Sequence, residues 1–251
     1  MNNQLCYKYI LKMRVNGVSL ATVIDIIRDW SIHRASRYIC VSNVHMCMET
    51  FDNEQYREVV NTADLVLADG KPLAIGLKML GCAENEHLRG ADLTRAILKD
   101  CDERREVVGL YGATEETMKG IVSLIGNNYP NIKIGCAVSP PFRQLSEEED
   151  NKHVQMINDA HVQVLFVGLG CPKQEKWMAE HQGKVMAVMV GIGAVFDFLG
   201  GTKNEAPKWV QQIGLEWLFR LLTEPRRLWK RYAIYNPRFV WHFTKQLMLK
   251  R

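Results

Sequence analysis

Three polar residues follow short apolar runs, and they are the first candidates for chemistry in this sequence. Asn43, Asp69 and Gln174 each come shortly after a segment rich in Val, Leu, Ile or Phe. Such segments are typical of buried strands in a parallel sheet, whose carboxyl ends meet at the edge where open α/β sheets bind ligands. A carboxylate partly buried at that edge has a raised pKa and suits general base catalysis. The pattern therefore predicts a shared crevice with Asp69 as its candidate base.

Each of these residues also has a purely structural interpretation. Asn43 suits the cap of the helix expected after it, and Asp69 before Gly70 suits an Asx-turn or a helix cap. Gln174 falls in a first helical turn that Pro172 would begin, and a solvated first turn explains it without any ligand. The residues alone leave both interpretations open.

Metal and dinucleotide chemistry find little support in the residue pattern. No cluster of His, Cys and carboxylates has the spacing of a metal site. Asp100 and Asp102 form a D-x-D pattern, but it closes an expected helix and continues into further charged residues. The glycine turn near Gly112 departs from G-x-G-x-x-G, and acids in the next helical turn disfavour a pyrophosphate there. We therefore expect no metal ion and no bound cofactor.

The elements that must position the candidate residues alternate along the chain. Apolar runs predict strands over residues 38–41, 65–68, 106–111, 132–138, 164–168 and 185–192. Helical spacing or capping residues predict helices over 15–30, with Ser19 as a possible cap, over 46–60, 73–80 and 88–101, and from residues 115, 146 and 172 onward. This alternation predicts an α/β fold with a mostly parallel, Rossmann-like sheet and helices on both faces.

The cysteines and the apolar runs indicate a compartment. The seven cysteines are scattered without a C-x-x-C pair, so we expect reduced thiols in the cytoplasm. No uninterrupted apolar run approaches the roughly 20 residues that span a bilayer. The N-terminal residues lack the apolar region and cleavage site of a signal peptide.

The last 46 residues differ in character from the first 205. From Arg220 to the end there are nine Lys or Arg and one Glu, a net charge of +8, whereas the whole chain carries +4. Aromatic residues interleave with these basic residues. We therefore expect a catalytic core over residues 1–205 and a helical, basic and aromatic appendage over 206–251. The appendage is either a docked helical hairpin with solvated charges or an amphipathic segment that meets anionic lipid or a phosphorylated ligand.

Several motifs occur together in an order that resembles a known family. They are Asn43 after a strand, A-D-G at 68–70, G-A-D-L at 90–93, P-P-F at 140–142, G-x-G-x-P-K-Q-E-x-W at 168–177, G-x-G-x-x-F-D-F at 191–198, A-P-x-W at 206–209, G-L-E-W at 214–217 and E-P-R-R-x-x-x-R-Y at 224–232. Over most of its length, the chain resembles the WecG/TagA/CpsF family of glycosyltransferases.

The resemblance implies an activity and its partners. It implies inverting transfer of a sugar, N-acetylmannosamine or a related hexose, from a UDP-sugar to a polyprenyl-diphosphate-linked sugar. Such transfers build teichoic acid linkages, capsules, exopolysaccharides or the enterobacterial common antigen. The enzyme would lie peripherally on the inner face of the cell membrane, meet an anionic membrane surface and bind no nucleic acid. Formation of a homo-oligomer stays open.

The resemblance also implies roles for residues. The family aspartate proposed as the base matches Asp69, and the glutamine thought to contact substrate matches Gln174. The family's C-terminal arginines, taken to meet the diphosphate, match Arg226, Arg227 and Arg231. The other residues expected to bind substrate are Asn43, Gly70, Arg89, Asp92 and Lys173.

This sequence departs from the family in two respects, and the first is that the arginine matched by Arg89, upstream of the G-x-D-L motif, does not have the usual spacing. The second concerns the residues before Asn43. The family often has Thr two residues before Asn43, where this chain has Val41 followed by Ser42. The chemistry still agrees with the residues, because one base takes the acceptor proton and arginines stabilise the departing diphosphate. Two other classes remain as alternatives, a nucleotide-binding oxidoreductase of Rossmann-like fold and a non-catalytic anion-binding module.

Overall fold

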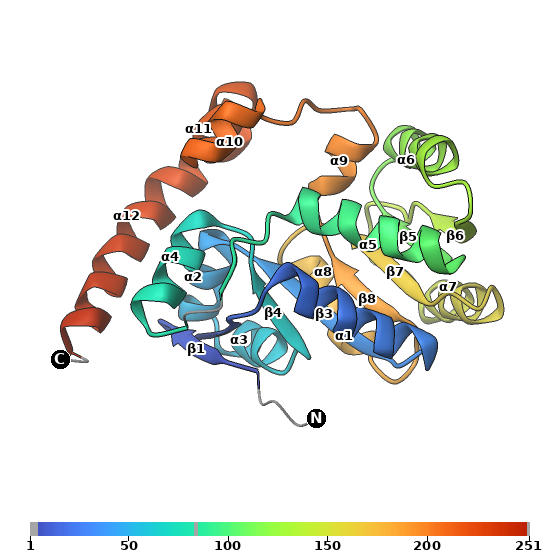
Figure 1. The fold of residues 1–251 in the computed structure, drawn as a ribbon, viewed down its shortest axis with the longest axis horizontal. Helices are drawn as coiled ribbons and strands as arrows, with labels where there is room; N and C mark the ends of the chain where they lie inside the picture. The colour runs from blue at the N-terminus through green and yellow to red at the C-terminus, as the bar shows by residue number, and fades with distance from the viewer. Residues whose placement is uncertain (1–4, 83–84, 250–251) are drawn as a thin grey trace.

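A six-stranded parallel sheet forms the centre of the molecule in the computed structural model, which describes residues 5–82 and 85–249 (Figure 1). The strands lie in the order β4-β3-β8-β7-β5-β6, and every neighbouring pair is parallel. Their bounds are β3 (Arg37–Ser42), β4 (Leu65–Ala68), β5 (Val107–Gly112), β6 (Lys133–Val138), β7 (Val164–Gly168) and β8 (Val188–Gly191). The predicted α/β class is confirmed, and so is each of the six predicted strands, with shifted ends.

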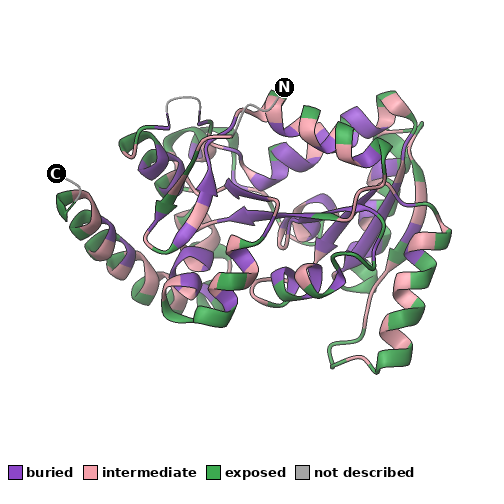
Figure 2. Cartoon of the chain, turned by 90° about the horizontal axis from the view of Figure 1, so that it is seen from below, coloured by how far each residue is buried: buried purple, intermediate pink, exposed green. Residues whose placement is uncertain are grey.

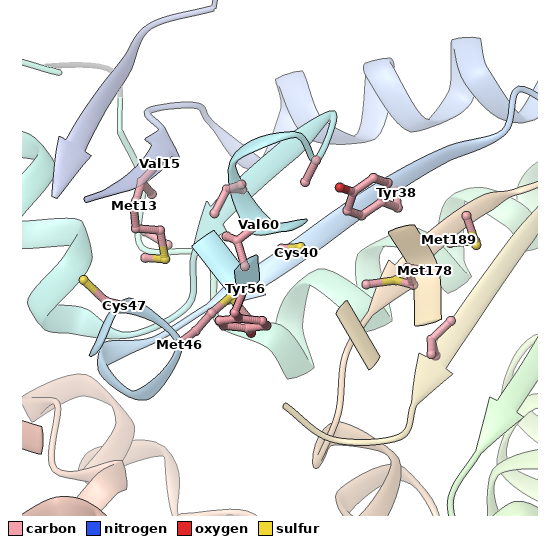
Figure 3. Packing of buried hydrophobic residues seen from close by; sticks show 14 of the residues in the cluster. Met13, Val15, Tyr38, Cys40, Met46, Cys47, Tyr56, Val60, Met178 and Met189 are labelled. Atoms are coloured by element: carbon pink, nitrogen blue, oxygen red, sulfur yellow. The ribbon is translucent and has the colours of Figure 1, made fainter. Parts of the chain in front are cut away.

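Helices cover both faces of the sheet, as the sequence predicts. One face packs against α1 (Leu20–Ile32), α5 (Gly90–Arg104), α6 (Glu115–Asn128) and α9 (Val195–Leu199). The other packs against α2 (Val44–Asp52), α3 (Glu54–Asn61), α4 (Lys71–Met79), α7 (Glu147–Asp159) and α8 (Lys173–His181). Successive strand residues point to opposite faces, so Ile39 and Val41 join the first core, whereas Tyr38 and Cys40 join the second (Figure 3).

Short polar side chains begin the helices where the sequence predicts them. Ser19 caps α1 by accepting from the Thr22 N–H, and Asn43 caps α2. Ser146 and Glu149 form a reciprocal capping box at the start of α7. These side-chain caps fix the residue at which each of the three helices begins.

Three helices follow the core and run beside it. They are α10 (Lys208–Ile213), α11 (Glu216–Thr223) and α12 (Pro225–Leu249). Figure 1 shows α12 passing alongside α4 and α2 to the C-terminus. Phe239 and Phe243 of α12 are buried in the same core as α2 and α4, while the outer side of α12 is exposed (Figure 2). Pro237 lies inside this helix without ending it. The division at residue 205 stays a prediction.

Two local predictions are wrong. The residues before α1 form an antiparallel hairpin of β1 (Tyr7–Ile10) and β2 (Met13–Asn16), so Val15 and Asn16 belong to a strand. The helix predicted over 46–60 is two helices, because Asn53 is extended and caps α3 with its side chain. Asn favours such local hydrogen bonds over a helix interior.

The expectation that all cysteines are reduced is wrong for one pair. Cys6 and Cys82 form a disulfide between the start of the hairpin and the segment after α4. Their separation of 76 residues gives no local motif, so only the fold brings them together. The other five cysteines are free thiols, and four of them are buried.

Candidate active site

Asp69 lies at the carboxyl end of β4, where the sequence predicts it. Its backbone N–H continues the sheet by donating to the Ser42 carbonyl, and its Oδ1 accepts from the Gly90 N–H at 2.6 Å. The helix that follows has no side-chain cap from Asp69, because its cap residue is Gly70. The carboxylate is thus held against the start of α5 and lines the two cavities of this region.

Two adjoining cavities meet at the carboxyl edge of the sheet. The strand-end cavity, about 350 Å³, is bounded by residues at the end of β3 and after β7 and β8, including Val41, Gly170 and Gly193. The aromatic cavity, about 310 Å³, lies between the start of α4 and helices α11 and α12. Its aromatic side chains are Trp217, Tyr232, Tyr235 and Phe239. Residues that line both cavities are Asn43, Asp69, Glu216, Arg220 and Arg231.

Asn43 both caps α2 and faces the site. Its Oδ1 accepts from the N–H groups of His45 and Met46, which confirms the cap interpretation. The same oxygen accepts from Nη2 of Arg231 at 3.3 Å. Asn43 therefore links the end of β3 to α12, so the structural role and the position in the site coexist.

Arg231 and Arg220 are cations without a carboxylate partner in the described residues. Arg231 Nε is buried and has no hydrogen-bond partner there, and neither does Arg220 Nε. The Arg220 guanidinium lies 5.6 Å from the centre of the Phe198 ring. Desolvation on burial lowers the pKa of Arg231, so its charge is disfavoured unless an anion approaches. These two arginines thus place positive charge beside Asp69 at the junction of the two cavities.

The other two predicted arginines of this segment lie farther out. Arg227 lines the strand-end cavity and pairs with Glu224 at 2.9 Å, with about half of its side chain exposed. Arg226 is exposed and lines neither cavity. The structure thus brings Arg231 into the centre of the site, places Arg227 at its edge and leaves Arg226 outside.

Arg89 has its donors occupied by carboxylates. It donates to Glu216, to Asp92 at 2.6 Å and to Glu205 at 2.8 Å. These bonds join α5 to α11 and to the segment before α10. Arg89 and Glu216 line the strand-end cavity, whereas Asp92 is exposed and lines neither cavity. In the structure Arg89 holds the appendage against the core.

The P-K-Q-E turn is divided between surface and interior. Lys173 is exposed and lines neither cavity, while Gln174 lines the strand-end cavity. Gln174 and Glu175 are 3% and 0% exposed. The interpretation as a solvated first turn is therefore wrong for Gln174 and Glu175, because this side of the first turn of α8 packs beneath the edge of the sheet. Gly70 lines the aromatic cavity.

Burial changes the acid–base behaviour of the site. Desolvation raises the pKa of Asp69, although the Gly90 N–H and the charges of His87 and Arg220 oppose the rise. Burial also raises the pKa of Glu216, with Arg89 opposing it. His45, which lines the aromatic cavity, has its pKa lowered to about 3 by burial and by Arg231. At neutral pH His45 is therefore uncharged, and burial favours proton uptake at both site carboxyls, Asp69 and Glu216.

Several residues of the site are not predicted from the sequence. Glu216 and Arg220 line both cavities, and His87 and His45 line the aromatic one. Glu216 and Arg220 are four residues apart, so a shared helical side was visible in the sequence. The Ser42 hydroxyl, in contrast, donates to the Leu67 carbonyl and does not reach the site.

Within residues 5–82 and 85–249, no group of three or more His, Cys, Asp or Glu has the geometry to hold a metal ion. Of the D-x-D pair, Asp100 binds Arg28 and Arg104, and Asp102 accepts from the Asn131 N–H. Both carboxylates are taken up by the helix end and its neighbours. Metal-independent chemistry stays a prediction.

Comparison with known proteins places this geometry in a family. Residues 8–251 match the model of the "Glycosyl transferase WecG/TagA/CpsF family". An N-acetylglucosaminyldiphosphoundecaprenol N-acetyl-beta-D-mannosaminyltransferase of Bacillus subtilis (strain 168) is 30% identical over 219 residues, which cover 85% of this chain and 82% of that protein. A protein of the same name from Staphylococcus aureus (strain NCTC 8325 / PS 47) is 24% identical over 239 residues, 94% of this chain and 91% of its own.

The family match extends over almost the whole chain and includes both the strand-end residues and the helices that close the site. The chain belongs to the WecG/TagA/CpsF family of glycosyltransferases.

Proposed function

We propose that this protein transfers N-acetylmannosamine, or a related hexose, from a UDP-sugar to a polyprenyl-diphosphate-linked sugar with inversion at the anomeric carbon. The observation that carries the proposal is the junction of the two cavities. Asp69, whose pKa is raised by burial, lies there beside two arginines that have no carboxylate partner in the described chain, Arg220 and Arg231. The names of the Bacillus and Staphylococcus relatives agree with a sugar on a polyprenyl diphosphate as acceptor.

The strand-end cavity is the better place for the nucleotide sugar. Its lining comes from the carboxyl ends of parallel strands, where α/β sheets bind nucleotides. Gly170 and Gly193 let the backbone approach a ligand closely, since both adopt positive φ angles that other residues rarely adopt. Arg227 at the edge and Arg231 at the junction supply cations for the diphosphate.

The aromatic cavity suits the acceptor. Trp217 and Tyr232 meet edge to face at its wall, and such rings pack well against the apolar side of a sugar. Phe239 and Val240 extend the apolar lining along α12 toward the outer side of the molecule. A sugar held near Asp69 would thus have its lipid directed along α12.

These groups can carry out a single displacement in which every proton and electron pair is accounted for. Asp69 takes the proton from the attacking hydroxyl of the acceptor while that oxygen bonds to the anomeric carbon of the donor. The bond from the anomeric carbon to the phosphate oxygen breaks, and UDP leaves with its electron pair. Arg220 and Arg231 stabilise the charge on the departing diphosphate. Glu216, the second acid nearby, is bound to Arg89 and is not free to act as a nucleophile.

The outer side of α12 suggests how the enzyme meets its lipid substrate. Trp229, Ile234 and Trp241 are more than half exposed, Ile234 and Trp241 share one side of the helix at a spacing of seven residues, and basic residues such as Lys230 and Lys245 lie near them in the sequence. Aromatic and basic side chains favour the headgroup region of an anionic membrane, and each Lys or Arg gains about 1 kcal/mol there. In the described residues no helix is both long and apolar enough to cross a bilayer. We propose a peripheral position on the inner face of the cell membrane.

The test is a panel of UDP-sugars offered with a short-chain polyprenyl-diphosphate-linked N-acetylglucosamine. We expect UDP release that depends on both the acceptor and a UDP-linked N-acetylmannosamine-type donor, and a product of inverted anomeric configuration by NMR. A product that retains the donor configuration would reject the single displacement. Acceptor-independent reduction of a nicotinamide cofactor, or binding without turnover, would favour the alternative classes.

A further inference from the structure

The side chain of Gln174 is buried, yet half of its amide lacks an internal partner. Gln174 is 3% exposed and lines the strand-end cavity from the start of α8. Its Nε2 lies 2.6 Å from Oε1 of the adjacent Glu175. Its Oε1 has no hydrogen-bond partner among the described residues. Buried polar atoms are nearly always paired, so an unpaired carbonyl oxygen at a cavity is a candidate to accept a hydrogen bond from a ligand.

The neighbours of Glu175 fix which end of the amide faces the cavity. The Tyr56 hydroxyl donates to Glu175 Oε2 at 3.0 Å. Tyr56 itself belongs to the buried hydrophobic cluster on this face of the sheet (Figure 3). Burial raises the pKa of Tyr56 well above its ordinary range, so this hydroxyl stays protonated and remains a donor. Burial raises the pKa of Glu175, and the hydrogen bonds from Gln174 and Tyr56 oppose the rise because they favour the carboxylate form. As a carboxylate, Glu175 only accepts hydrogen bonds, so the end of Gln174 beside it is the NH₂ and the carbonyl oxygen faces the cavity.

Two glycines leave space around this amide. A Cβ on Gly191 would come within 3.1 Å of Gln174 Nε2, closer than side chains normally pack. A Cβ on Gly193 would come within 3.4 Å of Gln174 Oε1. The absence of a side chain at Gly191 leaves room for the NH₂ end of the amide, and the absence of one at Gly193 leaves room beside its carbonyl oxygen.

We propose that Glu175 is a positioning residue that holds the Gln174 amide with its carbonyl oxygen toward the strand-end cavity, where it accepts a hydrogen bond from a hydroxyl or N–H group of the UDP-sugar. The proposal rests on the donor site proposed above. A site built to pair with such a group rejects a donor analogue that lacks it, because the buried acceptor is then left unpaired. Gln174 would thereby select among nucleotide sugars.

The test measures affinity for UDP and for the UDP-sugar by titration calorimetry in Gln174→Met, Glu175→Gln and the double variant. Gln174→Met should weaken UDP-sugar binding roughly tenfold, the upper range for one hydrogen bond. Glu175→Gln lets the amide turn either way, so it should weaken binding by a smaller factor. If Glu175 acts through Gln174, the double variant should lose no more than Gln174→Met alone.

The two ligands identify the source of the hydrogen bond. Weakened binding of UDP itself would place the paired group in the nucleotide, whereas unchanged UDP affinity would place it in the sugar. Tyr56→Phe is the matched control, because it removes a hydrogen bond to the same carboxylate and leaves the Gln174 contact. It should keep UDP-sugar affinity within about twofold, since Glu175 still orients the amide.

Three outcomes would overturn the positioning role. They are additive losses in the double variant, a loss in Tyr56→Phe as large as in Glu175→Gln, and unchanged affinity in Gln174→Met. If Glu175→Gln melts at a lower temperature than the wild type, Gln174→Met alone still tests the role of the Gln174 carbonyl oxygen. A wild-type protein that binds neither UDP nor any UDP-sugar would overturn the donor site itself, and this inference with it.

Discussion

Asp69 and Arg231 carry charge in surroundings that oppose it. Burial raises the pKa of the Asp69 carboxyl and lowers that of the Arg231 guanidinium. Groups whose ionised forms are disfavoured in the folded state mark functional sites, because selection for activity tolerates their cost in stability. Replacing either residue by an uncharged one should therefore lower activity without lowering stability.

Asp69→Asn should stabilise the protein at neutral pH. The pKa of Asp69 in the folded state is raised above its ordinary value of 3.8, so ionisation above that value disfavours folding. Asn keeps an oxygen for the Gly90 N–H and carries no charge. We expect a higher melting temperature for the variant at pH 7, by about 2–4 °C for each kcal/mol gained in a chain of this size. The difference should shrink as the pH falls through the folded-state pKa. Thermal melts across that range check this, and a lower melting temperature at pH 7 would contradict it.

Arg231→Met should lower kcat/KM without loss of stability. The substitution removes a buried charge that has no carboxylate partner in the described residues, but it also removes a donor to the diphosphate. Hydrogen bonds to charged groups contribute about 1.5–3 kcal/mol, which corresponds to roughly 10–100-fold in rate. Arg226→Met is the matched control on the same helix, and it should leave UDP release almost unchanged. Equal losses in both variants would show that only general positive charge matters.

At the scale of elements, the sequence predicts the sheet better than the site. Apolar runs identify all six parallel strands, because strands buried on both faces need nearly continuous apolar sequence. Asn43 and Asp69 are found as site candidates because they follow such runs. Arg220 and Glu216 are missed, since their roles depend on how α11 packs across the strand ends. The burial of Gln174 and Glu175 is also set by tertiary packing, and a polar first turn gives no sign of it.

Truncation after Leu215 should leave a folded core without activity. The cut removes α11 and α12, which supply Glu216, Arg220 and Arg231 to the junction and most of the aromatic cavity. It also exposes part of the core that Phe239 and Phe243 cover, so a modestly lower melting temperature is expected. UDP release and cosedimentation with anionic liposomes should both be lost. Full activity of the truncated core on a water-soluble acceptor would mean that the appendage only anchors the enzyme.

At the scale of the whole molecule, positive charge and exposed aromatic residues are concentrated in the C-terminal segment. The residues from Arg220 onward carry a net charge of +8, and the first 219 carry −4. Trp229 and Trp241 of α12 are 53% and 71% exposed. The active-site junction lies on the core-facing side of the same helix. One helix can thus meet the membrane and complete the active site.

Transfer should not require a divalent metal. In the proposed chemistry the arginines of α11 and α12 stabilise the leaving diphosphate, and no metal-binding group of three ligands occurs in the described residues. Activity after dialysis against EDTA should equal that of untreated enzyme, and added magnesium or manganese should change it little. A loss on dialysis that either ion restores would assign the diphosphate charge to a metal instead of the arginines.

The central claim is that Asp69 takes the acceptor proton at the junction of donor and acceptor cavities. The most direct measurement compares wild type and Asp69→Asn for UDP release with the polyprenyl-diphosphate acceptor and for UDP-sugar affinity without it. General base catalysis contributes roughly 10²–10⁴-fold, so turnover should fall by that factor while donor affinity stays nearly intact. Near-wild-type turnover in a folded Asp69→Asn protein would contradict the assignment.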